Sequence, residues 1–205
     1  MCKILGYGED VLTLWALKRR TSDILKSFHD QTAPSDCLIF YRPSFGRSGG
    51  EQSAEFGEFD AILASSENIY LVESKWDNLA SFKNSKITIR PEQKLRHQIF
   101  SWYLTHWDKK YHNNWESFVK ESQHDFKFKK TIAPSNSLLA TNLEFILNKL
   151  LEHCKRFSPN NIKNMLLFFY NAEKSRKPTE IKDFTLIPID YSKEILGNFV
   201  ALYSQ

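Results

Sequence analysis

The sequence predicts an α/β fold with a central mixed β-sheet, and three observations support that class. Residues 56–64 and 68–76 are short apolar segments joined by a turn-forming run, which predicts a β-hairpin. Residues 137–154 carry leucines at helical spacing in a wide apolar stripe. Two more apolar segments, residues 165–170 and 184–189, follow that helix. Such alternation of strands and helices is typical of helices packed on a sheet.

Three elements are predicted before the hairpin. Residues 8–28 place apolar side chains at helical spacing and predict one helix. Residues 37–41 form a short apolar run that predicts the first strand. Residues 43–50 are rich in turn-forming residues and predict a flexible loop directly before the hairpin. A loop in that place could move over a substrate.

The sequence pattern after the hairpin is less regular. Residues 76–88 are polar and irregular, and Pro91 then fits the first turn of a helix that runs to about residue 107. Residues 108–130 are dense in aromatic and polar side chains without clean periodicity, which favours a loop pinned to the body of the protein. Pro188 predicts a sheet edge or strand end, because proline donates no ladder hydrogen bond. Residues 192–203 are predicted to form a closing helix.

The composition is that of one soluble globular domain spanning residues 1–205. Of the 205 residues 41% are hydrophobic and 25% are charged. No apolar run approaches the ~18–20 residues that span a bilayer, and no signal peptide is recognised. The three cysteines are scattered without metal-ligand spacing, which favours a reducing cytoplasmic location and argues against zinc.

Charged side chains interrupt the apolar rows of the two hairpin strands. Glu58 and Asp60 alternate with apolar residues along the first strand, and Glu73 and Lys75 do so along the second. An ionised group in such a row costs several kcal/mol unless it is paired or coordinated. The hairpin predicts Asp60 and Glu73 on neighbouring strands near the same end, with Lys75 on the same side as Glu73. Carboxylate oxygens there would suit Mg²⁺ or Mn²⁺.

Two structural explanations of these charges remain open. Glu58 fits a solvated acid on an edge strand. Asp60 and Lys75 fit a cross-strand ion pair, which contributes about 0.2–1 kcal/mol. Such a pair accounts for two of the charges but gives no reason for Glu73.

Asp60, Glu73 and Lys75 resemble the signature of the PD-(D/E)xK, restriction-endonuclease-like superfamily, in which an acid on one strand and an E-x-K on the next bind catalytic metal. The preceding Gly57-Glu58-Phe59-Asp60 is similar to the G-E-x-D form of archaeal junction resolvases, RecB-type nucleases and Mrr-like restriction enzymes. The residue before the acid is Phe59 instead of proline, a position where the family is lax. The resemblance implies a three-layer sandwich with a central mixed sheet flanked by helices. It also implies a Mg²⁺- or Mn²⁺-dependent nuclease, an endonuclease that hydrolyses DNA phosphodiester bonds.

The resemblance also implies roles for individual residues. Asp60 and Glu73 would hold the metal together with the Ser74 carbonyl, Lys75 would position the attacking water, and Glu58 would be auxiliary. Many relatives have an N-terminal helix whose glutamate approaches the metal, and Glu9 matches that position. An acid in the first turn of a helix is also favoured by the helix macrodipole, which needs no metal.

A glutamine on the helix after E-x-K lines the site in several of these families. Gln98 is our candidate for that role, with Gln93 as the second choice, and a plain surface glutamine explains Gln98 equally well.

Basic residues flank the motif although the net charge is only +4. If several converge on the site they would neutralise nucleic-acid phosphates and make binding salt-dependent. Ordinary solvated faces are the alternative. The residues proposed to contact nucleic acid are Arg42, Arg47, Lys83, Lys86 and Arg90.

Other functions stay open at this stage. A non-catalytic nucleic-acid-binding or assembly module could retain the nuclease scaffold, although such a module has no need of Asp60, Glu73 and Lys75 together. RNA is a further possible substrate. Relatives often act as homodimers, so the resemblance implies a possible homodimer here, and no membrane partner is expected.

Overall fold

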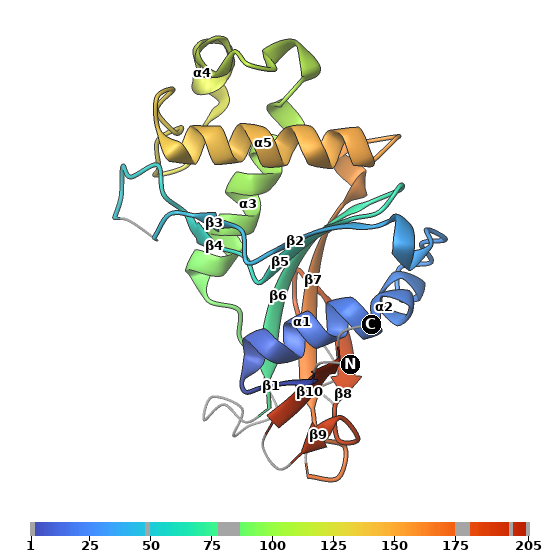
Figure 1. The fold of residues 1–205 in the computed structure, drawn as a ribbon. Helices are drawn as coiled ribbons and strands as arrows, with labels where there is room; N and C mark the ends of the chain where they lie inside the picture. Colours follow the sequence, from blue (N-terminus) through green and yellow to red (C-terminus); the bar gives the residue numbers. More distant parts are fainter. Residues whose placement is uncertain (1–2, 48–49, 78–86, 175–180, 197–198, 204–205) are drawn as a thin grey trace. The chain divides into compact units, whose positions relative to one another are not determined.

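The computed structural model describes residues 3–47, 50–77, 87–174, 181–196 and 199–203 (Figure 1). The chain divides into two compact units that are each built from several segments. Unit 1 comprises Met1–Cys37, Val72–Thr88 and Lys163–Gln205, and unit 2 comprises Leu38–Leu71 and Ile89–Ile162.

The main sheet has five strands in the order β2-β5-β6-β7-β8. Strands β2 (Leu38–Tyr41) and β5 (Ala61–Ala64) pair antiparallel, whereas β7 (Ile162–Tyr170) and β8 (Thr185–Asp190) pair parallel. Strand β6 (Ile69–Trp76) lies in the middle of this order. The prediction of an α/β protein with a mixed central sheet is therefore confirmed.

Unit 2 begins with a long antiparallel hairpin that bends in the middle. Beyond β2 and β5 the chain continues as β3 (Ser44–Phe45) and β4 (Gly57–Glu58), which form a separate two-stranded ladder. The bend lies at Arg42, whose φ of 51° is unusual for a residue with a side chain, and Gly57 adopts a φ of 107°.

Two hydrogen bonds cross the bend and keep the hairpin in register. The Arg42 N–H donates to the Asp60 carbonyl at 3.2 Å, and the Phe59 N–H donates to the Pro43 carbonyl at 3.2 Å. The predicted single strand over residues 56–64 is therefore wrong, because the chain leaves the main sheet at Asp60. The predicted loop over residues 43–50 is wrong for Ser44–Phe45, which form β3.

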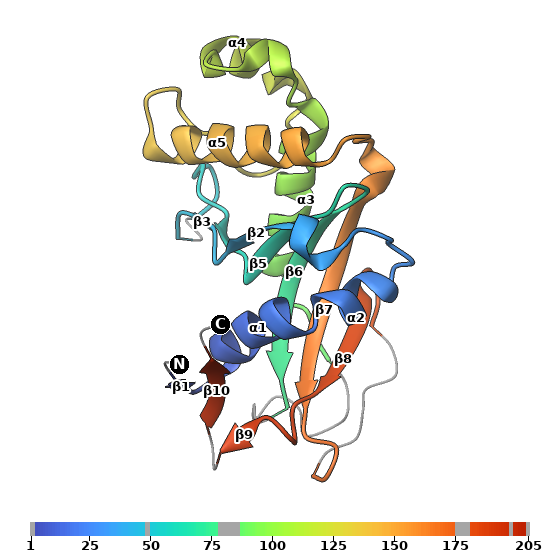
Figure 2. The same cartoon turned by 45° about the vertical axis from the view of Figure 1, so that its right-hand side comes forward.

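The helices of unit 2 are α3 (Pro91–His106), α4 (Trp115–Ser122) and α5 (Leu138–His153), with α5 crossing α3 in Figures 1 and 2. The predictions of α3 and α5 are confirmed. Short 3-10 turns accompany them at Lys109–Tyr111, Gln123–Asp125 and Pro159–Asn161.

Helix α4 contradicts the predicted loop over residues 108–130. Asn114 caps this helix by accepting a hydrogen bond from the Ser117 N–H at 3.2 Å. Trp115 and Phe118 are buried and their rings lie 5.1 Å apart, so aromatic packing holds a helix too short for a clear periodic signal.

Unit 2 has a core rich in aromatic rings. Phe59 is fully buried, and its ring lies 6.0 Å from that of Phe45 and 5.4 Å from that of Phe100. Phe45 also stacks on Phe56 at 4.9 Å. The bend therefore places Phe59 in the core while Asp60, the next residue, is half-buried.

Unit 1 contains a small second sheet in the order β1-β10-β9, formed by β1 (Lys3–Gly6), β9 (Ile195–Leu196) and β10 (Phe199–Tyr203). The predicted closing helix over residues 192–203 is therefore wrong. The segment pairs antiparallel with β1 from Gly6↔Val200 to Lys3↔Tyr203, and this long-range pairing overrides the local pattern.

The N-terminal helical region of unit 1 forms two helices. Helix α1 (Glu9–Arg19) and helix α2 (Thr21–Lys26) are separated at Arg20, which has a non-helical φ of −119°. The predicted single helix over residues 8–28 is therefore corrected to two.

In Figure 2, β7 and β8 lie side by side, and β8 is the last strand in the sheet order, so the edge position predicted from Pro188 is confirmed. Among the described residues no helix has the length and apolar character to cross a bilayer.

Candidate active site

Strand β6 carries the E-x-K motif in a buried setting. Its residues are buried on both faces from Ile69 to Ser74, and Lys75 is half-buried. Glu73 and Ser74 have no exposed surface. The sheet order explains this burial, because β6 is a central strand with a neighbour on each side. The predicted interruption of an apolar strand by charged groups is confirmed.

Helix α1 of unit 1 brings Glu9 to the same strand. The Trp76 backbone N–H donates a hydrogen bond to the Glu9 carboxylate, and Lys75 and Glu73 lie near enough to act on its charge. Burial raises the pKa of Glu9 above its ordinary value of 4.5. The Lys75 ammonium and the Trp76 hydrogen bond oppose that rise, while the negative charge of Glu73 adds to it.

One oxygen of Glu9 has no hydrogen-bond partner among the described residues. Its Oε2 is buried, and no described residue donates to it. A buried carboxylate oxygen in this condition is costly, because it has lost water without gaining a donor. A cation or a substrate proton would satisfy this oxygen.

A hydrogen bond fastens α1 to β6 beside these acids. The Thr13 and Ser74 hydroxyls are hydrogen-bonded at 2.8 Å, and both residues are buried. Thr13 lies one helical turn after Glu9, and its hydroxyl also donates to the Glu9 carbonyl at 2.8 Å. Sequence reasoning missed Thr13, although its spacing of four residues from Glu9 puts both on one helix face.

Gly8 is the residue directly before the start of α1, next to this site. Its φ of 100° and ψ of 178° form a backbone conformation that suits glycine, and the helix begins with the next residue. Glu9 therefore occupies the first helical position, where the macrodipole favours a negative charge.

The acids and the lysine of unit 1 fit a divalent cation. Glu9 and Glu73 offer hard oxygen ligands next to an ammonium group, and Mg²⁺ is commonly held by one or two protein carboxylates with water and phosphate in its other positions. Within the described residues no group of three or more His, Cys, Asp or Glu side chains has a metal-binding arrangement. A site in this unit would therefore rest on two carboxylates.

The other two predicted acids lie in unit 2. Asp60 is half-buried directly before β5, where its carbonyl accepts from Arg42. Glu58 lies on β4 and forms an ion pair with the Arg42 guanidinium, whose Nε donates to Glu58 Oε1 at 2.8 Å. The Glu58 and Arg42 side chains are 38% and 45% exposed, so this pair is a surface interaction.

The predicted glutamines have separate positions on α3. Gln98 is exposed on that helix. The Gln93 Oε1 accepts a hydrogen bond from the Arg90 N–H at 3.1 Å, which gives Gln93 a capping role at the start of the helix.

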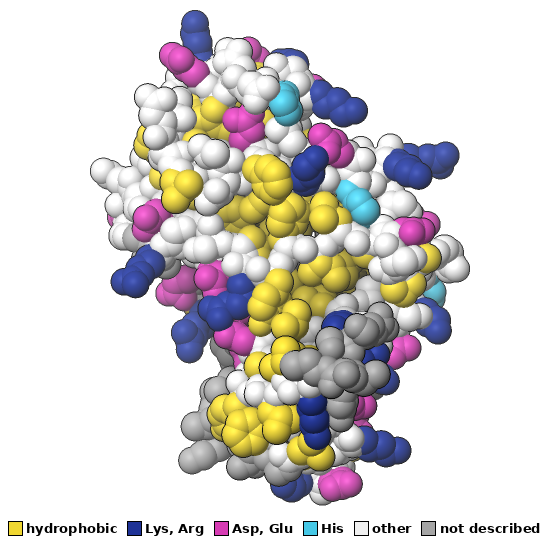
Figure 3. Space-filling model, viewed as in Figure 1, with side chains coloured by type: hydrophobic (Ala, Val, Ile, Leu, Met, Phe, Trp, Pro, Cys, Tyr) yellow, Lys and Arg dark blue, Asp and Glu magenta, His cyan; other side chains and the backbone are white. Residues whose placement is uncertain are grey.

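The structure describes three of the five basic residues that were predicted to contact nucleic acid. Arg47 and Arg90 are exposed in unit 2, and Arg42 is engaged with Glu58. Lys83 and Lys86 lie outside the described residues. Figure 3 shows lysines and arginines scattered over the drawn face among exposed hydrophobic side chains.

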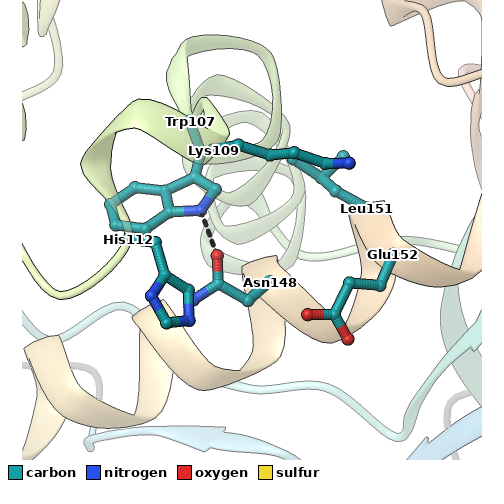
Figure 4. A pocket seen from close by; sticks show the side chains of 6 residues that line it. All are labelled: Trp107, Lys109, His112, Asn148, Leu151 and Glu152. Carbon is teal, nitrogen blue, oxygen red and sulfur yellow. Dashed lines mark hydrogen bonds between the residues drawn. The ribbon is translucent and has the colours of Figure 1, made fainter.

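Unit 2 also has a cavity of about 280 Å³, drawn in Figure 4. The Trp107 indole N–H donates to Asn148 Oδ1 at 2.9 Å on one wall of it. Lys109, His112 and Glu152 all line it, so the cavity contains both basic and acidic groups. This mixture of charges does not indicate whether a bound ligand would be an anion or a cation. The lining residues are Trp107, Lys109, His112, Asn148, Leu151 and Glu152. None of them is among the residues predicted for the site.

Comparison of the chain with protein-family models, with curated proteins and with solved structures gave no match.

Proposed function

We propose that the protein is a metal-dependent nuclease of the PD-(D/E)xK type, an endonuclease that hydrolyses DNA phosphodiester bonds on a three-layer, restriction-endonuclease-like fold. The observation that carries this proposal is the group formed by Glu9, Glu73 and Lys75 at the end of a buried central strand, with one carboxylate oxygen that has no donor among the described residues. A plain ion pair would have satisfied that oxygen.

Asp60 enters the proposal through the register of the hairpin. The Ser65 N–H donates to the Asn68 carbonyl at 2.9 Å and closes the turn between β5 and β6. Counting five residues outward on each strand from this pair predicts Asp60 opposite Glu73. Asp60 also lies where the chain leaves the main sheet, directly before β5.

The residues would divide the work as follows. Glu73 and Glu9, with the Ser74 carbonyl, would hold Mg²⁺ or Mn²⁺ within unit 1, and the role of Asp60 stays the expectation drawn from the motif. When bound, such an ion supplies Lewis acidity toward a phosphate oxygen. The Lys75 ammonium would orient the attacking water and offset negative charge that grows on the phosphate. The burial of Glu73 keeps its carboxylate in a region of low dielectric, where these interactions are stronger.

The substrate side of the proposal depends on exposed cations. Arg47 and Arg90 are accessible for contacts with backbone phosphates. Such contacts make binding fall steeply with salt and carry no sequence preference. The resemblance of the motif to that of DNA endonucleases makes DNA the proposed substrate, with RNA as a second substrate to be assayed in parallel.

Plasmid nicking in Mg²⁺ or Mn²⁺ tests the proposal. The variants Glu73→Gln and Lys75→Met should each reduce cutting by about 100-fold or more, because each removes a charge from the reacting centre. Glu116→Gln changes an exposed acid on α4 and serves as the matched control. The proposal fails if Glu73→Gln and Lys75→Met cut as fast as the control.

Binding measurements separate the nuclease from a module that only binds. A non-catalytic module would hold DNA equally well in the presence of a chelator and would show no turnover with either metal. A nuclease should bind Mn²⁺ directly in the absence of DNA, and Glu73→Gln should abolish that binding.

A further inference from the structure

The Tyr191 hydroxyl lies between two polar groups at the end of β6. It accepts a hydrogen bond from the Trp76 indole N–H at 2.9 Å and donates one to Asp77 Oδ1 at 2.8 Å. Tyr191 is only 6% exposed, and both of these bonds are partly buried. Trp76 and Asp77 directly follow the Lys75 of the candidate site.

Asp77 is held by further bonds to the segment at the end of β7. Its Oδ2 accepts from the Asn171 N–H at 2.8 Å, and its own N–H donates to the Phe169 carbonyl at 2.9 Å. The Tyr191 N–H donates to the Tyr170 carbonyl at 3.1 Å. One network therefore ties together the ends of β6, β7 and β8 within unit 1.

Trp76 connects this network to Glu9. Its backbone N–H donates to the Glu9 carboxylate, while its indole N–H donates to Tyr191. Its ring also packs edge-on against Tyr7 at 5.4 Å, just before the start of α1. A shift of the Trp76 backbone would thus move the donor that holds one oxygen of Glu9, and the indole bond to Tyr191 restrains that residue.

We propose that Tyr191 is a positioning residue of the candidate metal site, in which its hydroxyl fixes Trp76 and Asp77 and thereby the Glu9 carboxylate and the end of β6 that carries Lys75. This inference rests on the proposed function and names a residue that the sequence motif does not contain. Burial raises the pKa of Tyr191 to about 12, so the hydroxyl keeps the proton that it donates to Asp77 throughout the neutral range. Groups that orient metal ligands are commonly responsible for 10–100-fold effects on metal affinity or activity.

The test compares the hydroxyls of two tyrosines that have the same exposed fraction. Tyr191→Phe removes the network hydroxyl, whereas Tyr111→Phe removes a hydroxyl that donates to Glu121 Oε2 at 2.8 Å in unit 2. Both tyrosines are 6% exposed. The full chain is measured for Mn²⁺ affinity by electron paramagnetic resonance, for DNA cutting, for thermal unfolding and for amide exchange at Trp76 and Asp77.

Tyr191→Phe should weaken Mn²⁺ binding by about 10-fold, lower kcat more than it changes KM, and speed exchange of the Trp76 and Asp77 amides. Tyr111→Phe should change none of these beyond a modest fall in Tm. Trp76→Phe is the second variant, for use if Tyr191→Phe does not fold. It removes the indole donor, keeps an aromatic ring and should also weaken Mn²⁺ binding.

Two outcomes would overturn the inference. One is a fall in Tm with unchanged Mn²⁺ affinity and amide exchange, which is the result of a purely structural role. The other is an equal effect of Tyr111→Phe on Mn²⁺ affinity. Failure of the proposed function looks different, because the parent protein would then bind no Mn²⁺, while amide exchange would still show whether Tyr191 holds Trp76 and Asp77.

Discussion

The Thr13 hydroxyl of α1 is hydrogen-bonded to the Ser74 hydroxyl of β6 at 2.8 Å, in a buried position. Glu9 lies one turn before Thr13, and Glu73 directly precedes Ser74. This contact therefore joins the two segments that carry the acids of the candidate site. Its loss should affect both the stability of unit 1 and the position of Glu9.

Thr13→Val tests that link because valine keeps the shape of threonine and removes its hydroxyl. The variant should lower the free energy of unfolding by about 1 kcal/mol, the typical net value of one buried hydrogen bond. Urea denaturation measures this change. Thr141→Val alters a hydroxyl that bonds the Ser137 carbonyl on the exposed side of α5, and it should have a smaller effect. Equal effects of the two variants would contradict a special role for Thr13.

Gly57 of the G-E-F-D segment is predicted to be intolerant of a side chain. Its φ is 107°, and an added Cβ would lie 2.9 Å from Arg96 Nη1. Gly57→Ala should therefore destabilise the protein by about 1–3 kcal/mol, the cost of one strained backbone conformation. Differential scanning calorimetry would detect the fall in Tm.

Gly50→Ala is the matched control for that substitution. No described atom lies within 4 Å of the Cβ that Gly50 would gain. Its Tm should stay close to that of the parent. If Gly57→Ala were equally harmless, the left-handed conformation at Gly57 would not be needed for the bend in the hairpin.

Glu9→Gln should make the metal-free protein more stable at neutral pH. Burial raises the pKa of Glu9 above 4.5, so the folded state favours its neutral form. The stability that this group contributes is complete below pH 4.5 and is lost as the pH rises through its folded-state pKa. Glutamine carries no charge at any pH, so its advantage should appear above that pKa and vanish in acid.

Urea denaturation with a chelator, at pH 7 and in acid, measures this difference between Glu9→Gln and the parent. Added Mn²⁺ should reverse the order at pH 7, because the ion would stabilise only the parent. A Glu9→Gln protein that is less stable than the parent at pH 7 without metal would contradict the described burial of Glu9.

Local patterns determined several elements of this protein. Helix α3 begins at Pro91, which supplies a backbone suited to the first turn, and α5 begins after Ser137, whose hydroxyl accepts from the Ala140 N–H at 3.1 Å. The charged residues of β6 were recognised because a buried strand has no local reason to carry them. These features depend on residues that are close in sequence, so a short window of the sequence is enough to predict them.

Long-range pairing determined what local patterns missed. Residues 199–203 form a strand because β1, at the other end of the chain, pairs with them. The hairpin bends at Asp60 because of the backbone at Arg42, across the ladder. In both cases the pairing segment lies far away in sequence, so a short window of neighbouring residues cannot predict the strand or the bend.

The sequence by itself determined the mixed α/β class, the buried strand β6 and the choice of Glu73 and Lys75 as candidate site residues, because strand periodicity and the cost of buried charge are local properties. Only the tertiary structure decided that Glu9 keeps a buried oxygen without a described donor, and that Tyr191 and Asp77 hold Trp76 beside it. Those relationships depend on hydrogen bonds between residues more than 60 positions apart, and such bonds exist only after the chain has folded.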